Sequence, residues 1–596
     1  WLKRRSASAR ASIPSLAALP SPAMKEHIMG TRVVAGQNWI GDERLMERPK
    51  SEASFPSNWH WELACKHLQA GDASAALINT LSGLLEAPPK SPLRGKLEAL
   101  IGDGRLQEEM KQVNTFGLKV LNPRRHGFLM SPPKSALPPP KPPVPPQLRP
   151  PPGGEDSKWP PPRHVKWLCG QECPVIHCGG SSALPQEALT LITQGQPCVL
   201  RGLDFFPAAR ERWSFSYLSE HLRERHSVFC SNDGRYSYWW GKPNTAGFNF
   251  VEPTQRQELT FPEFLRRREE EAAKGDGANE DLYLQEAIYR GKAIQHGQDP
   301  LRRNAMDCQM NRDWDEGLCW DTLKQVQAAG KFQELSTSTL FCSGSGAFSR
   351  PHFDQNPNLY LQVKGAKRWL LFAPEHGPKL YPYPQGHPLD RKSRIDFECP
   401  QLEVFPNAAS LRHLGLEVTL GPGDVLWLPS HWWHSVQSLE PETLSVNFWW
   451  HPTQDGTALA PALIAAEVAR DIEMLIQEIV GPQSTARFLR DWREEVMPTA
   501  PQERQLRVLI LLALSTRGRD EVKLLRRFLD AQRYAGLHFG EQDVPAPAPS
   551  PRQAVASSCA RSLGVGLGGG AAAAAWHAPV EGCRRYRGQP RRSARQ

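Results

Sequence analysis

The chain has 596 residues, with 72 Lys and Arg against 63 Asp and Glu, so its formal net charge is +9. Hydrophobic residues make up 40% and aromatic residues 9%, which excludes a chain that is disordered throughout. Residues 551–596 hold eight Arg and one Glu, so most of the net charge lies in this tail and we expect no nucleic-acid partner for the folded part. The longest apolar run, Val508 to Leu514, is far shorter than the roughly 20 residues of a membrane helix. We therefore expect no membrane partner.

Residues 1–165 are predicted to form an extension of low order. Its first 19 residues are basic and Ser-rich, which loosely resembles a mitochondrial transit peptide. Residues 60–85 and 97–121 carry apolar side chains at three-to-four spacing, which indicates short helices. The segment from Pro132 to Pro162 is a polyproline linker, and its residues 134–152 could bind SH3 or WW domains.

The 12 Cys follow no regular spacing, so we expect reduced thiols in an intracellular compartment. Cys169, Cys173, His177 and Cys178 could together hold zinc. Their spacing fits no common zinc finger, so unremarkable loop cysteines are the alternative interpretation.

Residues 166–455 are predicted to form the main folded domain, with a mainly β core and flanking helices. Short segments rich in Val, Leu, Phe and Trp alternate there with Gly and Pro turns, which favours a sandwich or barrel. Residues 456–540 have helical periodicity, and residues 541–596 are a low-complexity tail that we predict to be disordered. One helix of the third segment, 463–480, has an apolar stripe formed by Ile464, Val468, Ile472, Leu475 and Ile479.

One group of residues in the β-rich segment suggests metal chemistry. His352 and Asp354 are two positions apart, so on a strand both side chains point to the same side, and His434 follows in a distant strand. Two His and one carboxylate on one face of a metal leave three positions open, which is the arrangement of non-haem Fe(II) oxygenases. A His-x-Asp triplet also arises by chance, so ordinary core or surface residues are the alternative.

Lys367 lies just after a predicted hairpin turn, and Asn358 continues the parity of His352 and Asp354. A lysine that points into a barrel with a metal needs an anion as partner, because burying an unpaired charge is costly. A dicarboxylate cosubstrate that chelates the metal would supply this anion. The alternative is a solvated lysine on the hairpin.

With these residues in place, the stretch 184–495 resembles the JmjC-type 2-oxoglutarate oxygenases and, within that family, the asparaginyl hydroxylases that act on hypoxia-inducible factor. The shared segments are LYLQ (282–285), PHFDQNPN (351–358), QVKGAKR (362–368), LYPYP (380–384), HPLDRKSRIDF (387–397), GPGDVLWLP (421–429), WWH (432–434) and VNFWW (446–450). The resemblance implies that residues 166–455 form a catalytic double-stranded β-helix, that is, a cupin-like jelly roll, and that residues 456–540 form a helical dimerisation segment. The alternative is that the helix at 463–480 packs on its own barrel.

The resemblance also implies site residues. Iron would be held by His352, Asp354 and His434, and 2-oxoglutarate by Tyr283, Ser349, Asn358, Lys367 and Asn447. The substrate would be bordered by Tyr238, Gln285, Arg391, Lys392 and Trp449. Ser349 stands where the family has Thr, which keeps the hydroxyl. Lys392 stands where the asparaginyl hydroxylases have a Gln that helps hold the target amide, so selectivity for asparagine is open.

The implied function is Fe(II)-, O₂- and 2-oxoglutarate-dependent hydroxylation of a protein, with succinate and CO₂ as co-products. The implied target is the β-carbon of Asn, Asp or His in ankyrin-repeat proteins or in the α subunit of hypoxia-inducible factor. A homodimer in the nucleus and cytoplasm is the implied setting. The alternatives are a lysyl demethylase or hydroxylase with another substrate, and a non-catalytic scaffold that works through the Pro-rich segment.

Overall fold

The computed structural model describes residues 59–123, 125–130, 171–237, 247–274, 281–290, 306–452 and 460–539. The predicted transit peptide, polyproline linker and basic tail lie outside these residues. The chain divides into two compact units, 1–542 and 543–596, and all described residues belong to the first.

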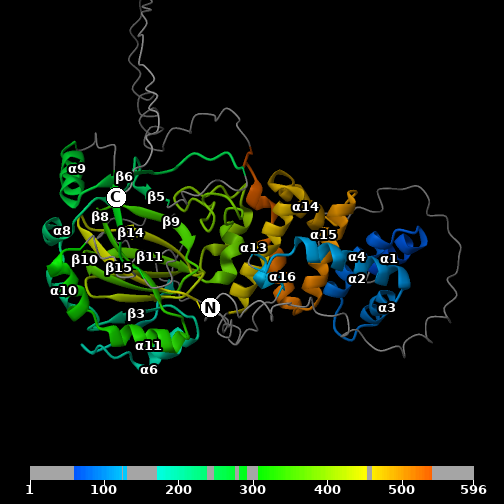
Figure 1. Ribbon diagram of the computed structural model, residues 1–596, viewed down its shortest axis with the longest axis horizontal. Helices are drawn as coiled ribbons and strands as arrows, with labels where there is room; N and C mark the ends of the chain where they lie inside the picture. Colours follow the sequence, from blue (N-terminus) through cyan, green and yellow to red (C-terminus); the bar gives the residue numbers. More distant parts are fainter. Residues whose placement is uncertain are drawn as a thin grey trace, which may run out of the picture. The chain divides into compact units, whose positions relative to one another are not determined.

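Two mixed β-sheets form the β-rich part of the first unit (Figure 1). The six-stranded sheet has the order β1 (Gln171–Glu172), β12 (Leu416–Leu420), β11 (Lys367–Phe372), β14 (Trp433–Ser438), β9 (Phe348–Phe353) and β5 (Arg235–Tyr236). The nine-stranded sheet has the order β2 (Val175–His177), β3 (Cys198–Arg201), β13 (Val425–Leu428), β10 (Asn358–Lys364), β15 (Thr443–Trp450), β8 (Leu335–Ser343), β7 (Asp281–Arg290), β4 (His226–Ser231) and β6 (Gln255–Leu259). From β9 to β15 the chain changes sheet at every step except between β11 and β12. This crossing confirms the predicted jelly roll with flanking helices.

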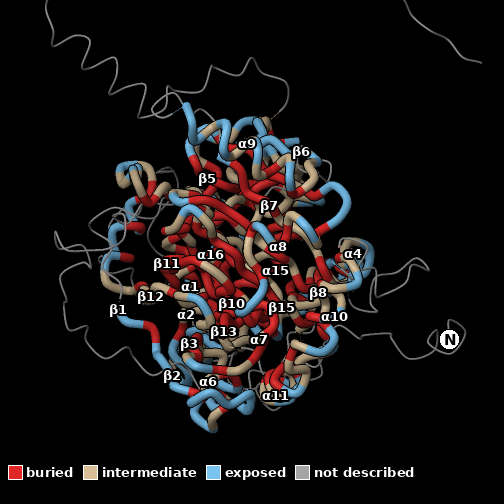
Figure 2. The backbone as a smooth tube through the Cα atoms, turned by 90° about the vertical axis from the view of Figure 1, so that its left-hand side faces the viewer, coloured by how far each residue is buried: buried red, intermediate tan, exposed pale blue. Residues whose placement is uncertain are grey.

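Strand alternation divides the side chains between two cores. Tyr360 of β10 and Trp369 of β11 face each other in one hydrophobic cluster between the sheets. The opposite face of β10, including Leu359 and Leu361, packs against helices outside the nine-stranded sheet. Those helices are α6 (Gln186–Thr193), α7 (Pro207–Arg212), α8 (Phe215–His221), α9 (Phe261–Ala273), α10 (Cys308–Gly317) and α11 (Trp320–Gly330). Figure 2 shows the strands as mainly buried and the outer helices α6 and α9 as largely exposed.

Helices from both ends of the described chain share a third core. The N-terminal helices are α1 (Trp59–Gln69), α2 (Ala73–Glu86), α3 (Pro92–Ile101), α4 (Gly104–Val120) and α5 (Gly127–Met130). The C-terminal helices are α13 (Pro461–Val480), α14 (Pro482–Arg493), α15 (Pro501–Ser515) and α16 (Arg519–Phe528). The helices predicted within 60–85 and 97–121 are therefore present, and they pack on the C-terminal ones.

The apolar stripe of α13 has its partners inside this shared core. Ile464, Val468, Ile472 and Leu475 are buried there, and Ile479 packs against the same cluster. Burial of the stripe therefore needs no second copy of the chain, so the stripe gives no support to the homodimer that the resemblance implies.

Asp72 both caps one helix and binds another helix of the helical part. Asp72 is the N-cap of α2, and its carboxylate accepts a hydrogen bond from the amide of Ala75 at 2.9 Å. The same carboxylate pairs with the guanidinium of Arg504 in α15 at 2.8 Å. The start of α2 is thus fixed to α15.

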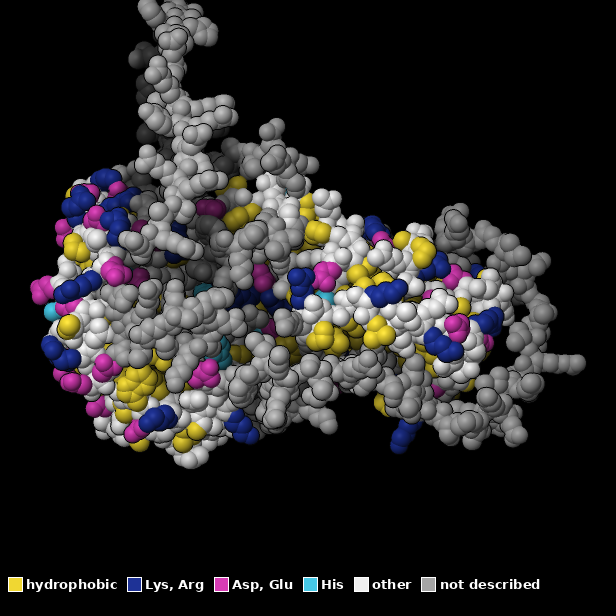
Figure 3. All heavy atoms as spheres, in the orientation of Figure 1, with side chains coloured by type: hydrophobic (Ala, Val, Ile, Leu, Met, Phe, Trp, Pro, Cys, Tyr) yellow, Lys and Arg dark blue, Asp and Glu magenta, His cyan; other side chains and the backbone are white. Residues whose placement is uncertain are grey.

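The described helices and the surface charges bear on the expected absence of membrane and nucleic-acid partners. None of the helices among the described residues is long and apolar enough to cross a bilayer. On the face seen in Figure 3, the basic and acidic side chains of the described residues are interspersed.

Cys173 and Cys178 are buried in different hydrophobic clusters, and His177 is exposed. These three described residues form no metal-binding group, and Cys169 lies outside the described part.

Candidate active site

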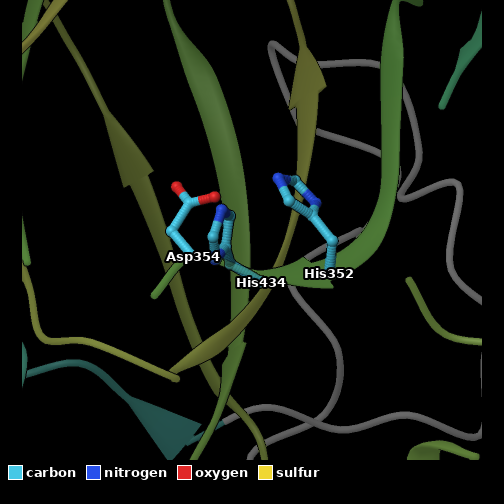
Figure 4. A group of neighbouring side chains, drawn as sticks. All are labelled: His352, Asp354 and His434. Carbon is cyan, nitrogen blue, oxygen red and sulfur yellow. The ribbon is translucent and has the colours of Figure 1, made fainter. Parts of the chain in front are cut away.

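His352, Asp354 and His434 converge between the sheets (Figure 4). His352 lies in β9, Asp354 follows the end of this strand, and His434 lies in β14. Their nearest ligand atoms all lie within 4.8 Å of one another, and the two imidazole rings are 4.2 Å apart between centroids. The structure therefore brings together the three residues that the sequence singled out.

The register of β9 and β14 explains how the two histidines meet. His352 is directly opposite His434, and Ser349 is opposite Val436, with a register shift between the two pairs. Such an irregularity changes which positions of the bulged strand face the same side. It lets Ser349 and His352, which are three positions apart, both lie on the side of the metal-binding group.

Each imidazole is held in one orientation by its own backbone neighbourhood. Nδ1 of His352 lies 2.7 Å from the carbonyl oxygen of Arg350, and Nδ1 of His434 lies 3.0 Å from that of Trp432. Only a protonated Nδ1 can donate to a carbonyl, so Nε2 of both rings is the free acceptor. Burial lowers the pKa of both side chains, which keeps them in the neutral form that a metal requires.

The side chains assigned to 2-oxoglutarate come from five strands around the same interior. Lys367 begins β11 and is 1% exposed, and its Nζ lies 3.4 Å from Oγ of Ser445 and 5.3 Å from the ring centre of Tyr283. Tyr283 of β7 shares a hydrogen bond with Ser349. Asn358 and Asn447 are buried on β10 and β15, where Asn447 is opposite Tyr360.

These residues fit an anionic cosubstrate. No carboxylate among the described residues lies within ion-pair distance of Lys367, and burial lowers its pKa to about 7. The side-chain oxygens of Asn358 and Asn447 have no hydrogen-bond partner in the described part of the chain. A buried lysine and two unsatisfied amides would be costly in an interior that held no polar ligand. A dicarboxylate would pair with the ammonium group and could accept hydrogen bonds from the Nδ2 groups of the two asparagines if their amides turn these donors toward it.

Of the residues expected to border the substrate, Lys392 is the one that the structure places beside the metal-binding group. Lys392 is buried, its backbone bridges to His352, and burial lowers its pKa to about 8 while Asp354 favours its charged form. Arg391 has a left-handed φ of 67°, and its carbonyl accepts from the amide of Phe353 at 3.2 Å. Gln285 and Trp449 lie on β7 and β15, and Tyr238 lies outside the described residues.

The strained backbone at Arg391 has a structural role. A left-handed conformation is uncommon for a residue with a Cβ and persists only where surrounding contacts enforce it. Here the turn lays Lys392 and Ser393 along β9, where the amide of Ser393 donates to the carbonyl of Pro351 at 2.8 Å. The chain thus places one cation directly beside the three candidate ligands.

A network that the sequence did not reveal braces this region from α13. Glu467 accepts from Gln355 at 3.1 Å and lies 2.5 Å from Nε2 of His431. The amide of His431, which has a left-handed φ of 64°, donates to the carbonyl of Asp354 at 2.8 Å. Glu467 therefore contacts Gln355, which follows Asp354 in the chain, and His431, whose amide binds the backbone of Asp354.

A second ion pair continues the bracing toward Lys392. Both guanidinium Nη atoms of Arg470 bind the carboxylate of Asp390, at 2.7 and 2.8 Å. Acidic residues on an otherwise apolar helix were the only signal in the sequence for this network. The other missed residues, Tyr360 and Ser445, share the parity of Asn358 and Asn447, so strand alternation could have found them.

Comparison with known proteins agrees with this geometry at the level of the domain. Residues 185–456 match the family described as "Cupin-like domain". The chain is 43% identical over 126 residues to HSPB1-associated protein 1 of Mus musculus, covering 20% of this chain and 25% of that protein. It is 30% identical over 205 residues to Lysine-specific demethylase JMJ31 of Arabidopsis thaliana, covering 33% and 36%. A third relative is Jumonji C domain-containing protein 5 of Drosophila melanogaster, at 39% over 106 residues, covering 18% and 25%.

The matches thus span about a quarter to a third of these curated relatives. They support a cupin-like domain of the JmjC kind. They do not support the narrower resemblance to asparaginyl hydroxylases that act on hypoxia-inducible factor.

Proposed function

Because residues 185–456 form a cupin-like domain related to JmjC proteins, we propose that the chain is an Fe(II)- and 2-oxoglutarate-dependent protein hydroxylase. This proposal rests on the presence of a candidate metal site and a candidate cosubstrate site in the same interior. A His-Asp-His group has free Nε2 atoms for a metal, and a buried Lys367 has no carboxylate partner among the described residues. A relic that had lost catalysis would have no physical reason to retain both.

Iron bound by His352, Asp354 and His434 would supply O₂ activation, so that 2-oxoglutarate, O₂ and a substrate C–H group become succinate, CO₂ and a C–OH group. The residues of this chain have separate tasks in that reaction. The backbone carbonyls of Arg350 and Trp432 fix the tautomer of the two imidazoles. Lys367 binds the carboxylate of the cosubstrate that is distal to the metal, and the apolar cluster between the sheets excludes water.

The target side chain in this proposal is neutral or acidic, with Asn or Asp as the favoured residue. Lys392 is a buried cation beside the ligands, with a pKa of about 8, so it is mainly charged at pH 7. A methylated or unmodified lysine brought to the same place would meet like charge at low dielectric. The amide of Asn or the carboxylate of Asp could instead accept a hydrogen bond from this ammonium group.

Turnover of 2-oxoglutarate tests the reaction class. The purified chain would be loaded anaerobically with Fe(II) and 2-oxoglutarate and then exposed to O₂, and succinate would be measured with and without ankyrin-repeat peptides. We expect peptide-stimulated succinate, and its absence in Lys367→Met with intact metal binding. A chain that binds no iron and forms no succinate would contradict the proposal and favour the scaffold.

A panel of matched peptides tests the target. Peptides that differ only in carrying Asn, Asp or trimethyl-lysine at one position would be examined for a gain of one oxygen or for loss of methyl with release of formaldehyde. We expect oxygen addition on Asn or Asp. Lys392→Gln should raise the ratio of Asn to Asp hydroxylation, since a neutral amide holds an amide but no longer attracts a carboxylate. Demethylation of the third peptide would instead support the lysyl demethylase.

The partner, oligomeric state and location are further parts of this proposal. The name HSPB1-associated protein 1 suggests HSPB1 as a partner, which co-purification of the full chain with HSPB1 would test. A homodimer would need a surface other than the buried stripe of α13, and light scattering of the purified chain measures it directly. Imaging of the tagged chain tests the expected nuclear and cytoplasmic location.

A further inference from the structure

A cavity of about 540 Å³ lies between the helical part and the short elements α12 (Gly377–Leu380) and η6 (Pro406–Leu411). Its other walls come from α1, α2, α14, α15 and α16. It shares no residue with the candidate active site. This volume is within the range of ~300–1,000 Å³ that holds metabolite-sized ligands.

Two arginines on its wall have unused hydrogen-bond donors. Arg507 of α15 is 2% exposed, and although its Nη1 donates to the carbonyl of Val496 at 2.6 Å, its Nε and Nη2 have no partner in the described residues. Arg526 of α16 binds Glu86 through Nη1 at 3.0 Å, and its buried Nε is likewise unpartnered. Buried donors of charged groups are costly when left unpaired.

The residues that line the cavity carry a net positive charge. The lining holds five basic residues, Lys379, Arg493, Arg507, Arg526 and Arg527, against three acidic ones, Glu375, Glu495 and Asp530. Asp530 is engaged by Arg493 at 3.2 Å, and Glu495 lies 3.5 Å from Nε2 of His60. Burial lowers the pKa of Arg507 to about 10, although Asp491, Glu495 and Glu503 favour its charged form, so it stays charged at neutral pH.

A cation is the less suitable occupant. His60, Glu86 and Glu495 do have the spacing of metal ligands. However, Arg526 already occupies one oxygen of Glu86, and Nε2 of His60 lies between both carboxylates, at 3.2 and 3.5 Å. The neighbouring guanidinium groups would repel a metal ion.

We propose that this cavity is a binding site for a metabolite-sized anion whose phosphate or carboxylate group is held by Arg507 and Arg526. The planar guanidinium fork matches both groups geometrically. Asn79, Ser82, Asn407 and Ser410 line the remaining space and provide further hydrogen-bonding groups for the body of the ligand. The site is separate from the metal-binding group and does not depend on the proposed hydroxylase activity.

Inorganic phosphate and citrate are the probes for the two head groups. Thermal unfolding and calorimetric titration of the metal-free full chain would compare each with sodium chloride at equal ionic strength. We expect saturable stabilisation by at least one probe, and phosphate alone or citrate alone would identify the head group. Arg507→Gln and, independently, Arg526→Gln should weaken binding about tenfold or more.

Matched variants distinguish binding in this cavity from attraction to surface charge or to the candidate active site. Arg490→Gln removes an equal charge from an exposed position on α14 and should bind the probes as the unmodified chain does. The inference is overturned if neither probe binds more strongly than chloride, or if Lys367→Met abolishes binding while both arginine variants retain it.

Discussion

The two buried histidines are prepared for a metal by hydrogen bonds within their own strands. Nδ1 of His352 and of His434 each lies beside the carbonyl oxygen of the residue two positions earlier, Arg350 and Trp432. This local geometry fixes Nε2 as the ligand atom before any metal arrives. Metal binding then releases no proton from these rings at neutral pH, because burial already lowers their pKa.

Replacement of one ligand tests this assignment. His352→Ala should reduce bound iron to background and abolish succinate formation, because two remaining ligands hold a divalent ion weakly. Metal content after dialysis and succinate yield are the measurements. His413→Ala, outside the metal-binding group, is the control and should retain both. Retention of stoichiometric iron by His352→Ala would refute the ligand set.

The titration of Lys367 predicts a pH dependence for cosubstrate binding. Burial lowers its pKa from 10.5 to about 7, so the free protein holds a charged ammonium at pH 6 and a mainly neutral amine at pH 8. A bound dicarboxylate raises this pKa again, so binding takes up a proton above pH 7 and affinity falls as pH rises. We expect 2-oxoglutarate affinity to be up to about tenfold lower at pH 8 than at pH 7.

Calorimetry in two buffers of different ionisation enthalpy measures this proton uptake. Lys367→Arg is the matched control, since its guanidinium stays charged and should bind the cosubstrate without taking up a proton. Equal proton uptake in both proteins would show that another group titrates.

At the residue scale, the sequence could predict the metal ligands but not the residues that surround them. Alternation along strands correctly grouped His352 and Asp354, the hairpin position indicated Lys367, and the family motifs added Tyr283 and Asn447. The left-handed turn at Arg391 and the position of Lys392 against β9 depend on contacts distant in the sequence. Local propensity carries no information about such contacts.

At the scale of elements, α13 connects the helical core with the metal-binding region. Its apolar side faces α15 and α16, while three buried acids face other parts of the chain. Glu467 reaches His431, Asp471 accepts from the amide of Leu129 at 2.9 Å, and Glu473 accepts from the amide of Gln385 at 3.1 Å. Periodicity predicted this helix and its stripe. It could not show whether helices of the same chain or a second copy of the chain cover the stripe, because the apolar residues recur every 3.6 positions in both cases.

This bracing predicts an effect on metal affinity from a residue that does not bind the metal. Glu467→Gln removes the charge that holds His431 and Gln355, so the segment carrying Asp354 becomes less fixed. We expect iron affinity to fall about tenfold, as is typical for residues that orient ligands. Competition with a chelator gives the affinity, and thermal unfolding reports the fold.

The control for this prediction lies on the same helix. Glu478→Gln removes an equal charge where Glu478 pairs with Arg125, away from the metal-binding region. It should leave iron affinity unchanged. If both variants weakened iron equally, the effect would be one of general stability, and a positioning role for Glu467 would be refuted.

At the scale of the whole molecule, the helical core joins segments from opposite ends of the described chain. Helix α2 packs on α15, and Asp72 binds Arg504 across this contact. The sequence predicted helices in both segments, but the Pro-rich stretch between them indicated separate regions. Amino-acid composition indicates which segments are ordered. It does not indicate that the apolar faces of two distant helices, here α2 and α15, pack against each other.

A shared core makes a specific prediction about stability. Leu77 of α2 is fully buried, so Leu77→Ala should lower the free energy of unfolding by about 2–5 kcal/mol through loss of packing and creation of a cavity. Leu118→Ala on α4 is the control, because Leu118 is 73% exposed and its truncation should change this free energy by less than about 0.5 kcal/mol. Hydrogen exchange of the Leu77 variant should also quicken in α15, since the two helices lose a common contact surface. If exchange quickened in α2 alone, the N-terminal helices would be an independent unit and the cavity between α2, α14 and α15 would lose one of its walls.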